Sequence, residues 1–310
     1  LQLSREFYAT AVRPLLAEQF PRVPYAAALL GPGSEVAGFD SQRSTDHDWG
    51  PRLQIFLPDR DADRHAAVLT AMLASRLPES FRGYPVAFPV TRGPGTVQHR
   101  VQATALGAWL TSHLGFDPRH AVTLLDWLAT PAQRLAEFTT GEVFHDGSGE
   151  LSRARAAMAW YPRDVWLYLL ACQWQRVGQE EAFPGRCAEA GDDLGSAVVT
   201  ARLARDLMRL CLLMHQRYPP YSKWLGTAFA RLPGTVGLTA SLAAALSACD
   251  WPAREQHLRE AITDPQIRRL PPAGAIDQFV DSTDAANDLR FLRACVQAAW
   301  VGETPGRDGG

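Results

Sequence analysis

Two short polar motifs near the start of the chain have residue types that could do chemistry. Gly33 and Ser34 lie one loop before the sequence Asp46, His47 and Asp48. A glycine allows close approach to the backbone, so exposed N–H groups and a serine hydroxyl could bind phosphate oxygens. Residues i and i+2 of an extended chain project to the same side, so both carboxylates could ligate Mg²⁺. Each motif alone is common in turns, but the two together favour nucleotide chemistry.

The segments that must position these motifs alternate between strand and helix patterns. Apolar runs flank the polar loop, an acidic stretch opens a helical period after it, and Val97 to Thr104 alternates apolar and polar residues. This order predicts a small mixed sheet with helices packed on it. The expected helices are 3–20, interrupted by Pro14, and 61–76, and the expected strands are 25–30, 53–57, 84–90 and 97–104.

After about residue 105 the strand signals stop and helical periods follow one another. The longest period, 193–217, carries an apolar stripe at Leu203, Leu207, Leu210 and Met214. The other expected helices are 118–128, 131–139, 151–160, 163–177, 222–231, 236–248, 251–263 and 284–300. The predicted fold class is therefore α+β: a mixed-sheet domain at 1–112, an all-helical bundle domain at 113–302 and a disordered tail at 303–310.

Composition excludes several classes of function. The 310 residues carry a formal net charge of -2, which gives no electrostatic reason to expect duplex DNA as a partner. No run reaches the roughly 18 apolar residues of a membrane span. The 5 cysteines are scattered without CxxC spacing, and no signal-peptide order opens the chain, so we expect a reduced cytoplasmic protein. Of the 31 basic residues only Lys223 is a lysine, which invites a chemical role for its compact charge.

The segment GPGSEVAGFDSQRSTDHDW resembles the pattern of the nucleotidyltransferase superfamily typified by DNA polymerase beta. That pattern is an apolar strand, Gly-Ser, a spacer, and Asp-x-Asp leading into a second strand. More closely, the chain resembles a bacterial family of nucleotidyltransferase-like proteins known as DUF4037. This second resemblance extends through DHDWGPRL, GEVFHD, YP-R-DVW, GDDLGS and RYPPYSKWLGTAF, and so covers nearly the whole chain.

The resemblance implies a mechanism. Asp46 and Asp48 would hold two Mg²⁺ ions on a nucleoside triphosphate, while Gly33 and Ser34 bind its terminal phosphates. A hydroxyl of a small-molecule or protein acceptor would attack the α-phosphorus, so that NMP, expected to be AMP from ATP, is transferred and pyrophosphate leaves. The sequence departs from the superfamily at Gln102, where a third carboxylate is usual, because an amide ligates magnesium weakly and cannot take a proton.

Residues of the helical half could complete the site. Lys223 follows a proline-fixed turn and would neutralise triphosphate charge, as Arg202 or Arg205 could, while Tyr221 could stack on a base. Asp192 could be the missing catalytic acid, and Asp126 and Asp193 are the other acids to inspect. The alternative for Asp192 is a structural cap at the start of the long helix.

Two further interpretations compete with a small-molecule or protein nucleotidyltransferase. Gln102 would also suit a degenerate nucleotidyltransferase that binds a nucleotide or a partner protein and regulates it. RNA nucleotidyl transfer is disfavoured by the net charge of -2 and by the lack of a basic extension. The sequence names neither the acceptor, the base preference nor the oligomeric state.

Overall fold

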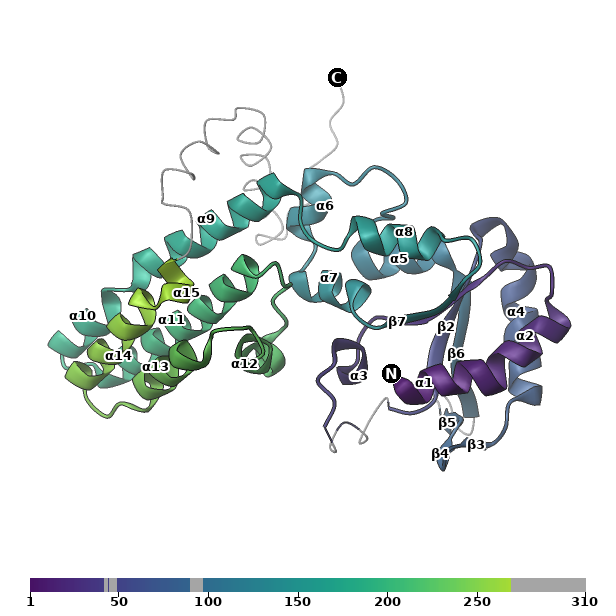
Figure 1. The fold of residues 1–310 in the computed structure, drawn as a ribbon, viewed down its shortest axis with the longest axis horizontal. Helices are drawn as coiled ribbons and strands as arrows, with labels where there is room; N and C mark the ends of the chain where they lie inside the picture. The colour runs from purple at the N-terminus through teal and green to yellow at the C-terminus, as the bar shows by residue number, and fades with distance from the viewer. Residues whose placement is uncertain (42–43, 45–48, 90–96, 269–310) are drawn as a thin grey trace, which may run out of the picture. The chain divides into compact units, whose positions relative to one another are not determined.

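The computed structural model describes residues 1–41, 44, 49–89 and 97–268. Contacts divide the chain into two compact units. The sheet unit comprises Leu1–Val122 and Thr130–Trp160, and the helical unit comprises Thr123–Ala129 and the residues from Tyr161 onward. The α+β fold class predicted from the sequence is confirmed, because a mixed sheet and a set of helices occupy different parts of the chain (Figure 1).

The sheet unit is built from short strands and the helices between them. Its elements are α1 (Gln2–Phe7), the π-helical turn η1 (Tyr8–Val12), α2 (Arg13–Gln19), β1 (Ala26–Leu29), α3 (Ser34–Ala37), β2 (Arg52–Leu57), α4 (Asp59–Arg76), β3 (Ser80–Phe81), β4 (Tyr84–Pro85), β5 (Ala87–Pro89), β6 (Val97–Ala105), α5 (Leu106–Leu114), α7 (Ala132–Thr139), β7 (Glu142–Asp146) and α8 (Glu150–Ala157).

The five-stranded sheet has the order β5-β6-β2-β1-β7. Strands β2 and β6 are parallel, and the other neighbouring pairs are antiparallel. Strands β1, β2 and β6 confirm the apolar runs and the alternation predicted from the sequence. The expectation that strands stop near residue 105 was wrong, because β7 pairs with the free edge of β1. The sheet unit consequently runs past residues 112 and 113, where the sequence placed a boundary.

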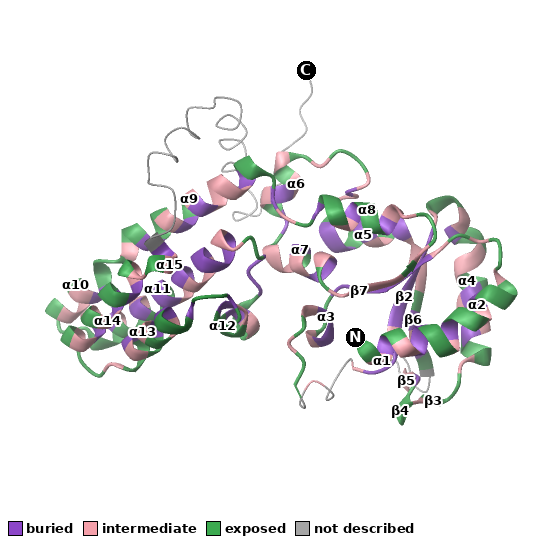
Figure 2. Ribbon diagram, viewed as in Figure 1, coloured by how far each residue is buried: buried purple, intermediate pink, exposed green. Residues whose placement is uncertain are grey.

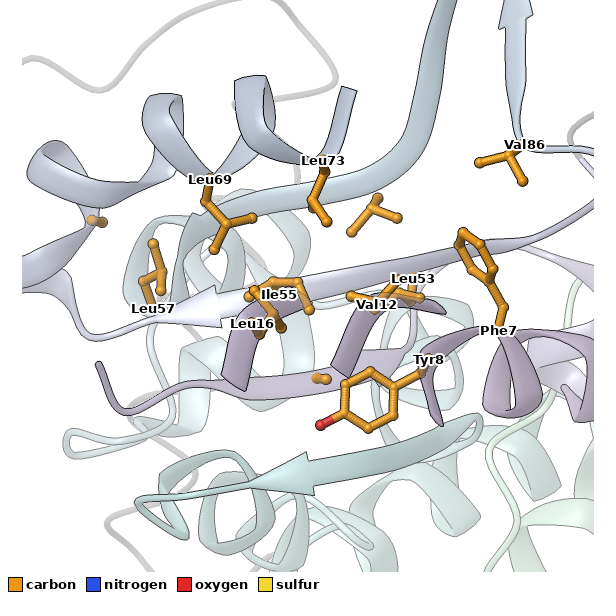
Figure 3. Close-up of a cluster of buried hydrophobic side chains, with 13 residues drawn as sticks. Phe7, Tyr8, Val12, Leu16, Leu53, Ile55, Leu57, Leu69, Leu73 and Val86 are labelled. Carbon is orange, nitrogen blue, oxygen red and sulfur yellow. The ribbon is translucent and has the colours of Figure 1, made fainter. Parts of the chain in front are cut away.

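One face of the sheet carries the core of this unit. Leu53, Ile55 and Leu57 of β2 meet Leu69 and Leu73 of α4, and all five side chains are almost fully buried. Figure 3 shows the two α4 leucines pointing at β2, with side chains of the N-terminal helix on the same cluster. Burial of this kind stabilises by roughly 2 kcal/mol for each large aliphatic side chain. Every residue of β1 is buried, as is every residue of β2 after Arg52 (buried residues are purple in Figure 2).

The opposite face of the sheet is divided along its strands. Phe56 near the end of β2 contacts Trp109 of α5, with ring centroids 5.1 Å apart, and Trp109 contacts Phe138 of α7. Toward the start of β2 this face instead carries Arg52 and Gln54, which alternate with the core residues. An aromatic layer and a polar area therefore share one face.

The N-terminal helix changes its winding just before its proline. Residues Tyr8–Val12 form a π-helical turn, and Pro14 lies in the first turn of α2. A proline inside a helix has no N–H to donate and crowds the preceding turn, and a local wide turn relieves that conflict. The interruption predicted at Pro14 is therefore accommodated without a break, since helical winding continues from Gln2 to Gln19.

The described part of the helical unit contains helices and connecting turns. They are α6 (Leu124–Ala129), α9 (Arg163–Glu180), α10 (Phe183–Glu189), α11 (Asp193–Met214), α12 (Ser222–Ala230), α13 (Val236–Ser247), α14 (Trp251–Thr263) and α15 (Pro265–Arg268). The Trp166 indole donates to the Leu213 carbonyl at 2.7 Å, and the Gln173 amide donates to the Asp206 carbonyl at 3.0 Å. These bonds place α9 antiparallel to α11. The expected helix 284–300 and the tail lie outside the described residues.

Most helices predicted from periodicity are confirmed, within a few residues at each end. The expected helix 118–128 is present only as α6, and helices α5 and α10 were not predicted. Within the described residues, no helix combines the length and the apolarity that crossing a membrane requires.

Arg119 ties several helix starts of the sheet unit together. Its guanidinium donates to Asp117 in its own loop, to Asp59 at the start of α4 and to Glu150 at the start of α8. Asp59 in turn accepts from the Gly107 N–H in the first turn of α5. Burial alone would raise the pKa of Asp117, but the hydrogen bonds from Arg119 outweigh it and lower that pKa. The stabilisation from Asp117 is therefore present at neutral pH and is lost as pH falls through the lowered folded value.

Replacement of Arg119 should destabilise the sheet unit strongly. We expect Arg119→Met to lower the free energy of unfolding by about 3 kcal/mol, because three carboxylates lose their shared cation. Urea unfolding at pH 7 followed by circular dichroism measures the change. Arg60→Met is the control, since that side chain is 83% exposed and should leave the stability nearly unchanged. Equal losses in both variants would contradict the role assigned to Arg119.

Candidate functional site: the Gly33-Ser34 turn and the start of strand β2

The structure describes only part of the site predicted from the sequence. The Gly33-Ser34 turn and strand β2 are described, whereas Asp46 and Asp48 lie outside the described residues. Both carboxylates lie a few residues before Arg52, the first residue of β2, and the described chain resumes at Trp49. The described site therefore consists of the turn and the strand on either side of the carboxylate pair.

Gly33 connects β1 to the short helix α3 in a conformation that favours glycine. Its φ is 148° and its ψ is 140°, values that other residues adopt only under strain. A Cβ atom at this position would also overlap the Arg52 guanidinium and the Glu35 carboxylate. Glycine is thus required here both by the backbone and by the neighbouring ion pair.

Ser34 opens helix α3 and already has a hydrogen-bond partner. Its hydroxyl donates to Oδ1 of Asp40 at 2.9 Å. A serine hydroxyl has a single hydrogen to donate, so donation to a phosphate oxygen would have to replace this bond. The predicted phosphate contact of Ser34 stays a prediction, and Asp40 is the group that would compete with it.

Arg52, the first residue of β2, reaches back to the turn. Its Nε donates to Oε1 of Glu35 at 2.6 Å, and Nη2 pairs with the same carboxylate. Nη2 also donates to the Pro32 carbonyl at 2.9 Å. The side chains of Arg52 and Glu35 are only 16% and 8% exposed, so solvent screens this pair weakly. Removing one member of such a pair typically costs roughly 3–5 kcal/mol, because the other charge is left buried.

Gln54 fastens the end of β1 from the same face of β2. Its Oε1 accepts from the Leu30 N–H and its Nε2 donates to the Leu30 carbonyl, both at 3.0 Å. The buried amide therefore satisfies the backbone N–H and C=O of Leu30, the residue between β1 and the glycine turn. Arg52 and Gln54 together are called the β2 clamp below. They fix residues 30–35 to the strand that follows the predicted metal ligands.

Strand β6 presents amides and a cation on the same face as the clamp. The parallel register sets Arg52 beside Arg100 and Gln54 beside Gln102. The Arg100 guanidinium lies 3.9 Å from the centre of the Phe88 ring and donates to the Trp49 carbonyl at 3.4 Å. A cavity of about 400 Å³ follows these two strands, lined by residues 52–54, residues 98–103 and Thr70.

Strand β6 offers no carboxylate on this face that could act as the third metal ligand. Side chains at 98, 100, 102 and 104 of β6 are Gln, Arg, Gln and Thr, and Gln102 is exposed. No group of three His, Cys, Asp or Glu residues among the described ones could hold a metal ion. Asp46 and Asp48, which lie outside that search, fit Mg²⁺ chemically, because this ion takes one or two carboxylates together with substrate phosphates.

Predicted site residues of the helical unit are found in ordinary structural contacts. Asp192 caps α11 by accepting from the Gly195 N–H at 2.7 Å, so the structural alternative from the sequence is confirmed. Its catalytic role stays a prediction. Asp126 accepts from the Thr123 N–H and hydroxyl at the start of α6. Arg202 pairs with Glu180 of α9, and Arg205 pairs with the buried Asp206.

The lysine motif of the helical unit is displayed at a helix start. Tyr221 is the N-cap residue of α12 and is 48% exposed. Lys223 is exposed in the first turn, with Nζ 4.9 Å from the centre of the Trp224 ring. The preceding Tyr218 is buried against Tyr161, with ring centroids 4.9 Å apart. The motif thus combines a buried anchor with an exposed cation and an exposed aromatic ring.

Four residues of the described site were not predicted from the sequence: Arg52, Gln54, Glu35 and Arg100. A signal for the first two was present, because RLQIFL sets polar residues at alternate positions of an otherwise apolar strand. Their partners could not be read from that pattern, since Leu30, Pro32 and Glu35 come from another element. Arg100 was recognised only as part of the alternation in β6.

Comparison with known proteins supports the family resemblance in part of the chain. Residues 127–225 match a domain of unknown function, DUF4037, which confirms the resemblance predicted from the segments within that range. A crystal structure of a nucleotidyltransferase-like protein from Exiguobacterium sibiricum is 10% identical, with a TM-score of 0.37. The alignment covers 84% of this chain and 71% of that chain. Similarity at this level carries no argument about the site. No curated protein matches the chain.

The fit between Gly33 and the Arg52–Glu35 pair can be measured. We expect Gly33→Ala to lower the free energy of unfolding by about 2 kcal/mol, from backbone strain and from displacement of the guanidinium. In an Arg52→Met background the same change should cost less, because the guanidinium, the closer of the two overlapping groups, is gone. Urea unfolding of the four proteins gives the coupling.

Gly38→Ala is the matched control for this cycle. Gly38 has a φ of 74° but no atom within 4 Å of its would-be Cβ, so only backbone strain applies. Its cost should be the same whether Arg52 is present or replaced in the Arg52→Met background. Gly33→Ala costs that are likewise independent of Arg52 would disprove the predicted conflict.

Proposed function

We propose that the protein is a Mg²⁺-dependent nucleotidyltransferase that moves NMP, AMP from ATP in particular, to a hydroxyl of a small molecule or protein with release of pyrophosphate. The observation that carries the proposal is the β2 clamp. It fixes the Gly33-Ser34 turn to the strand that directly follows Asp46 and Asp48 in sequence. A phosphate-binding turn and a metal-binding pair are useful together only if they keep one geometry during the reaction.

Each residue has a defined part in the proposed reaction. The N–H groups that follow Gly33 would bind phosphate oxygens, while the Arg52–Glu35 pair occupies the space that its missing side chain leaves. Asp46 and Asp48 would hold Mg²⁺, which when bound neutralises charge on the triphosphate and on the departing pyrophosphate. Ser34 would exchange its bond with Asp40 for one with a terminal phosphate.

Several residues of the helical unit are proposed as nucleotide ligands by their residue type. Lys223, the only lysine of the chain, would neutralise a terminal phosphate, with Arg202 or Arg205 as further cations. Tyr221 would offer its ring to the base. These assignments rest on residue type and exposure, and Asp192 is retained as a candidate catalytic acid on the same basis.

A second candidate function is supported by Gln102. A nucleotidyltransferase without a third carboxylate on β6 could bind a nucleotide or a partner protein and regulate it without transfer. Incubation with labelled ATP, Mg²⁺ and a cell extract separates the two functions. Label transfer that the protein accelerates requires the enzyme, and nucleotide binding without transfer supports the regulator.

Metal-dependent nucleotide binding tests the carboxylate pair. The double variant Asp46→Asn, Asp48→Asn should lose on the order of tenfold or more of its affinity for ATP in the presence of Mg²⁺, because neutral amides ligate the ion weakly. Isothermal titration calorimetry with and without Mg²⁺ measures the loss. The chain offers a matched control in Asp61→Asn, Asp63→Asn, a second Asp-x-Asp sequence that lies on helix α4. Unchanged affinity in the first variant would count heavily against the proposal.

The role of Lys223 is tested by comparing two ligands. Lys223→Ala should weaken binding of ATP by roughly tenfold or more, through loss of a charged contact to phosphate, and leave adenosine binding nearly unchanged. Arg163→Ala serves as control, because that cation is 80% exposed at the start of α9 and has no assigned role. Equal losses for ATP and adenosine would remove the phosphate role.

A further inference from the structure

Helix α13 is unusual among the described helices of the helical unit because it carries no charged residue. Its sequence is VGLTASLAAALS. A helix that is apolar on all sides is normally buried on all sides. One side of α13 follows this rule, since Leu238, Leu242 and Ala245 are buried and the helix contacts α11 and α14.

The opposite side of α13 is apolar and yet exposed. Val236 is 83% exposed, Leu246 is 51% exposed, and Ala240 and Ala243 are also exposed. With 3.6 residues per turn, positions 236, 240 and 243 lie on one face of the helix, and Leu246 lies at its border. We call these four residues the α13 face. An uncharged face that runs along a whole helix is the kind of surface that packs against another apolar element.

The sequence contains a second apolar helix face that needs a partner. The helical period at 284–300 lies outside the described residues. In a helix over this range, Leu289, Leu292 and Val296 would form one apolar stripe, because they recur at a spacing of three and then four residues. Arg290 would lie outside the stripe. The segment is thus amphipathic, and a stripe of this kind is stable in water only when it is covered.

We propose that residues 284–300 form a helix that packs its apolar stripe against the α13 face. The described chain ends at Arg268 in α15, which contacts α11 and α14, the same two helices that contact α13 (Figure 1). The 15 residues from 269 to 283 can span up to about 50 Å. Packed helices are only roughly 10 Å apart, so this connection is long enough to reach α13. The inference is independent of the proposed nucleotidyl transfer.

The covalent connection favours this segment over a second copy of the chain as the partner of the α13 face. A segment held by a short linker is present at an effective concentration of about 1 mM. A second copy binds only at the concentration of the protein itself, which is far lower in a dilute solution. The segment of the same chain therefore occupies the face first.

A second exposed apolar area of the helical unit is a weaker candidate for the same segment. It lies at the start of α11, where Leu194 is 77% exposed and Val198 is 52% exposed. One turn further along that side the chain places Arg202 and Arg205, which pair with Glu180 and Asp206. These charges limit the apolar area of α11 to about two turns. The α13 face has no such interruption.

Cross-linking tests the contact, because the proposed segment contains Cys295 at the border of its apolar stripe. The starting variant keeps Cys295 and the buried Cys211. Serine replaces the other three cysteines, which are Cys172, Cys187 and Cys249. This variant is full-length, and its circular dichroism is compared with that of the original protein.

Two matched cysteine variants are then made in this background. Ala243→Cys adds a thiol on the α13 face, and Ala201→Cys adds one at an exposed position of α11. Each protein is treated with a short bismaleimide at low protein concentration, and the linked peptides are identified by mass spectrometry. We expect Ala243→Cys to give a link to Cys295 within one chain, in roughly tenfold higher yield than Ala201→Cys.

Other results would overturn the inference. A link between two chains would assign the α13 face to a second copy. A yield from Ala201→Cys that equals or exceeds that from Ala243→Cys would place the segment on α11 or on no fixed surface. The absence of a link to Cys295 in both variants would also contradict the proposed contact.

Trypsin cleavage after Arg290 gives an independent readout. Cleavage requires the segment to leave the α13 face, so it reports the population of the undocked state. The double variant Ala240→Asp, Ala243→Asp sets two charges against the apolar stripe and should raise the cleavage rate roughly tenfold. The matched control is Ala197→Asp, Ala201→Asp at exposed positions of α11, which should leave the rate unchanged. Equal cleavage rates in the original protein and in the α13 variant would overturn the inference.

Discussion

The arrangement of the candidate site depends on one ion pair, between Arg52 at the start of β2 and Glu35 in helix α3. The guanidinium also holds the Pro32 carbonyl, so the turn between β1 and α3 has its position set by a side chain from the neighbouring strand. Because the pair occupies the space beside Gly33, that residue has no room for a side chain. The same contact balances the negative charge of Glu35 with the positive charge of Arg52. Glu35 therefore has a structural role and is not a candidate for the chemistry.

The two faces of the sheet have different roles. On one face Leu53, Ile55 and Leu57 join a dry core with α4 and the N-terminal helix. On the other face the alternate residues Arg52 and Gln54 bind backbone groups of the turn, and β6 adds Arg100 and Gln102 beside them. A period of two residues in β2 is thus enough to supply stability in one direction and a polar surface in the other. A shift of one residue in register would exchange these roles, so the core also fixes the clamp.

The sequence was a good guide to segments with strong periodicity and a poor guide to pairings between distant segments. Apolar runs predicted β1 and β2, and helical periods predicted α4, α9 and α11. Strand β7 was missed because EVFHD contains only two apolar residues and becomes a strand through pairing with β1. The partners of Arg52 and Gln54 were likewise set by tertiary packing. The place of Gln102 on a strand could be predicted from the alternation of its neighbours. That it lines the cavity could not be predicted, because this depends on the register between β6 and β2.

The addition of β7 beside β1 has a consequence for how the protein is made. The chain completes β1 early but supplies its second neighbour only at residues 142–146, after the segment Thr123–Ala129, which belongs to the helical unit. During synthesis the backbone N–H and C=O groups along this edge of the Ala-rich strand β1 therefore stay unpaired until β7, more than a hundred residues later, has been made. Fragments that end near residue 122 would keep that edge exposed and would be prone to associate. No single cut in the chain yields both units intact, because Thr123–Ala129 of the helical unit lies between the two segments of the sheet unit.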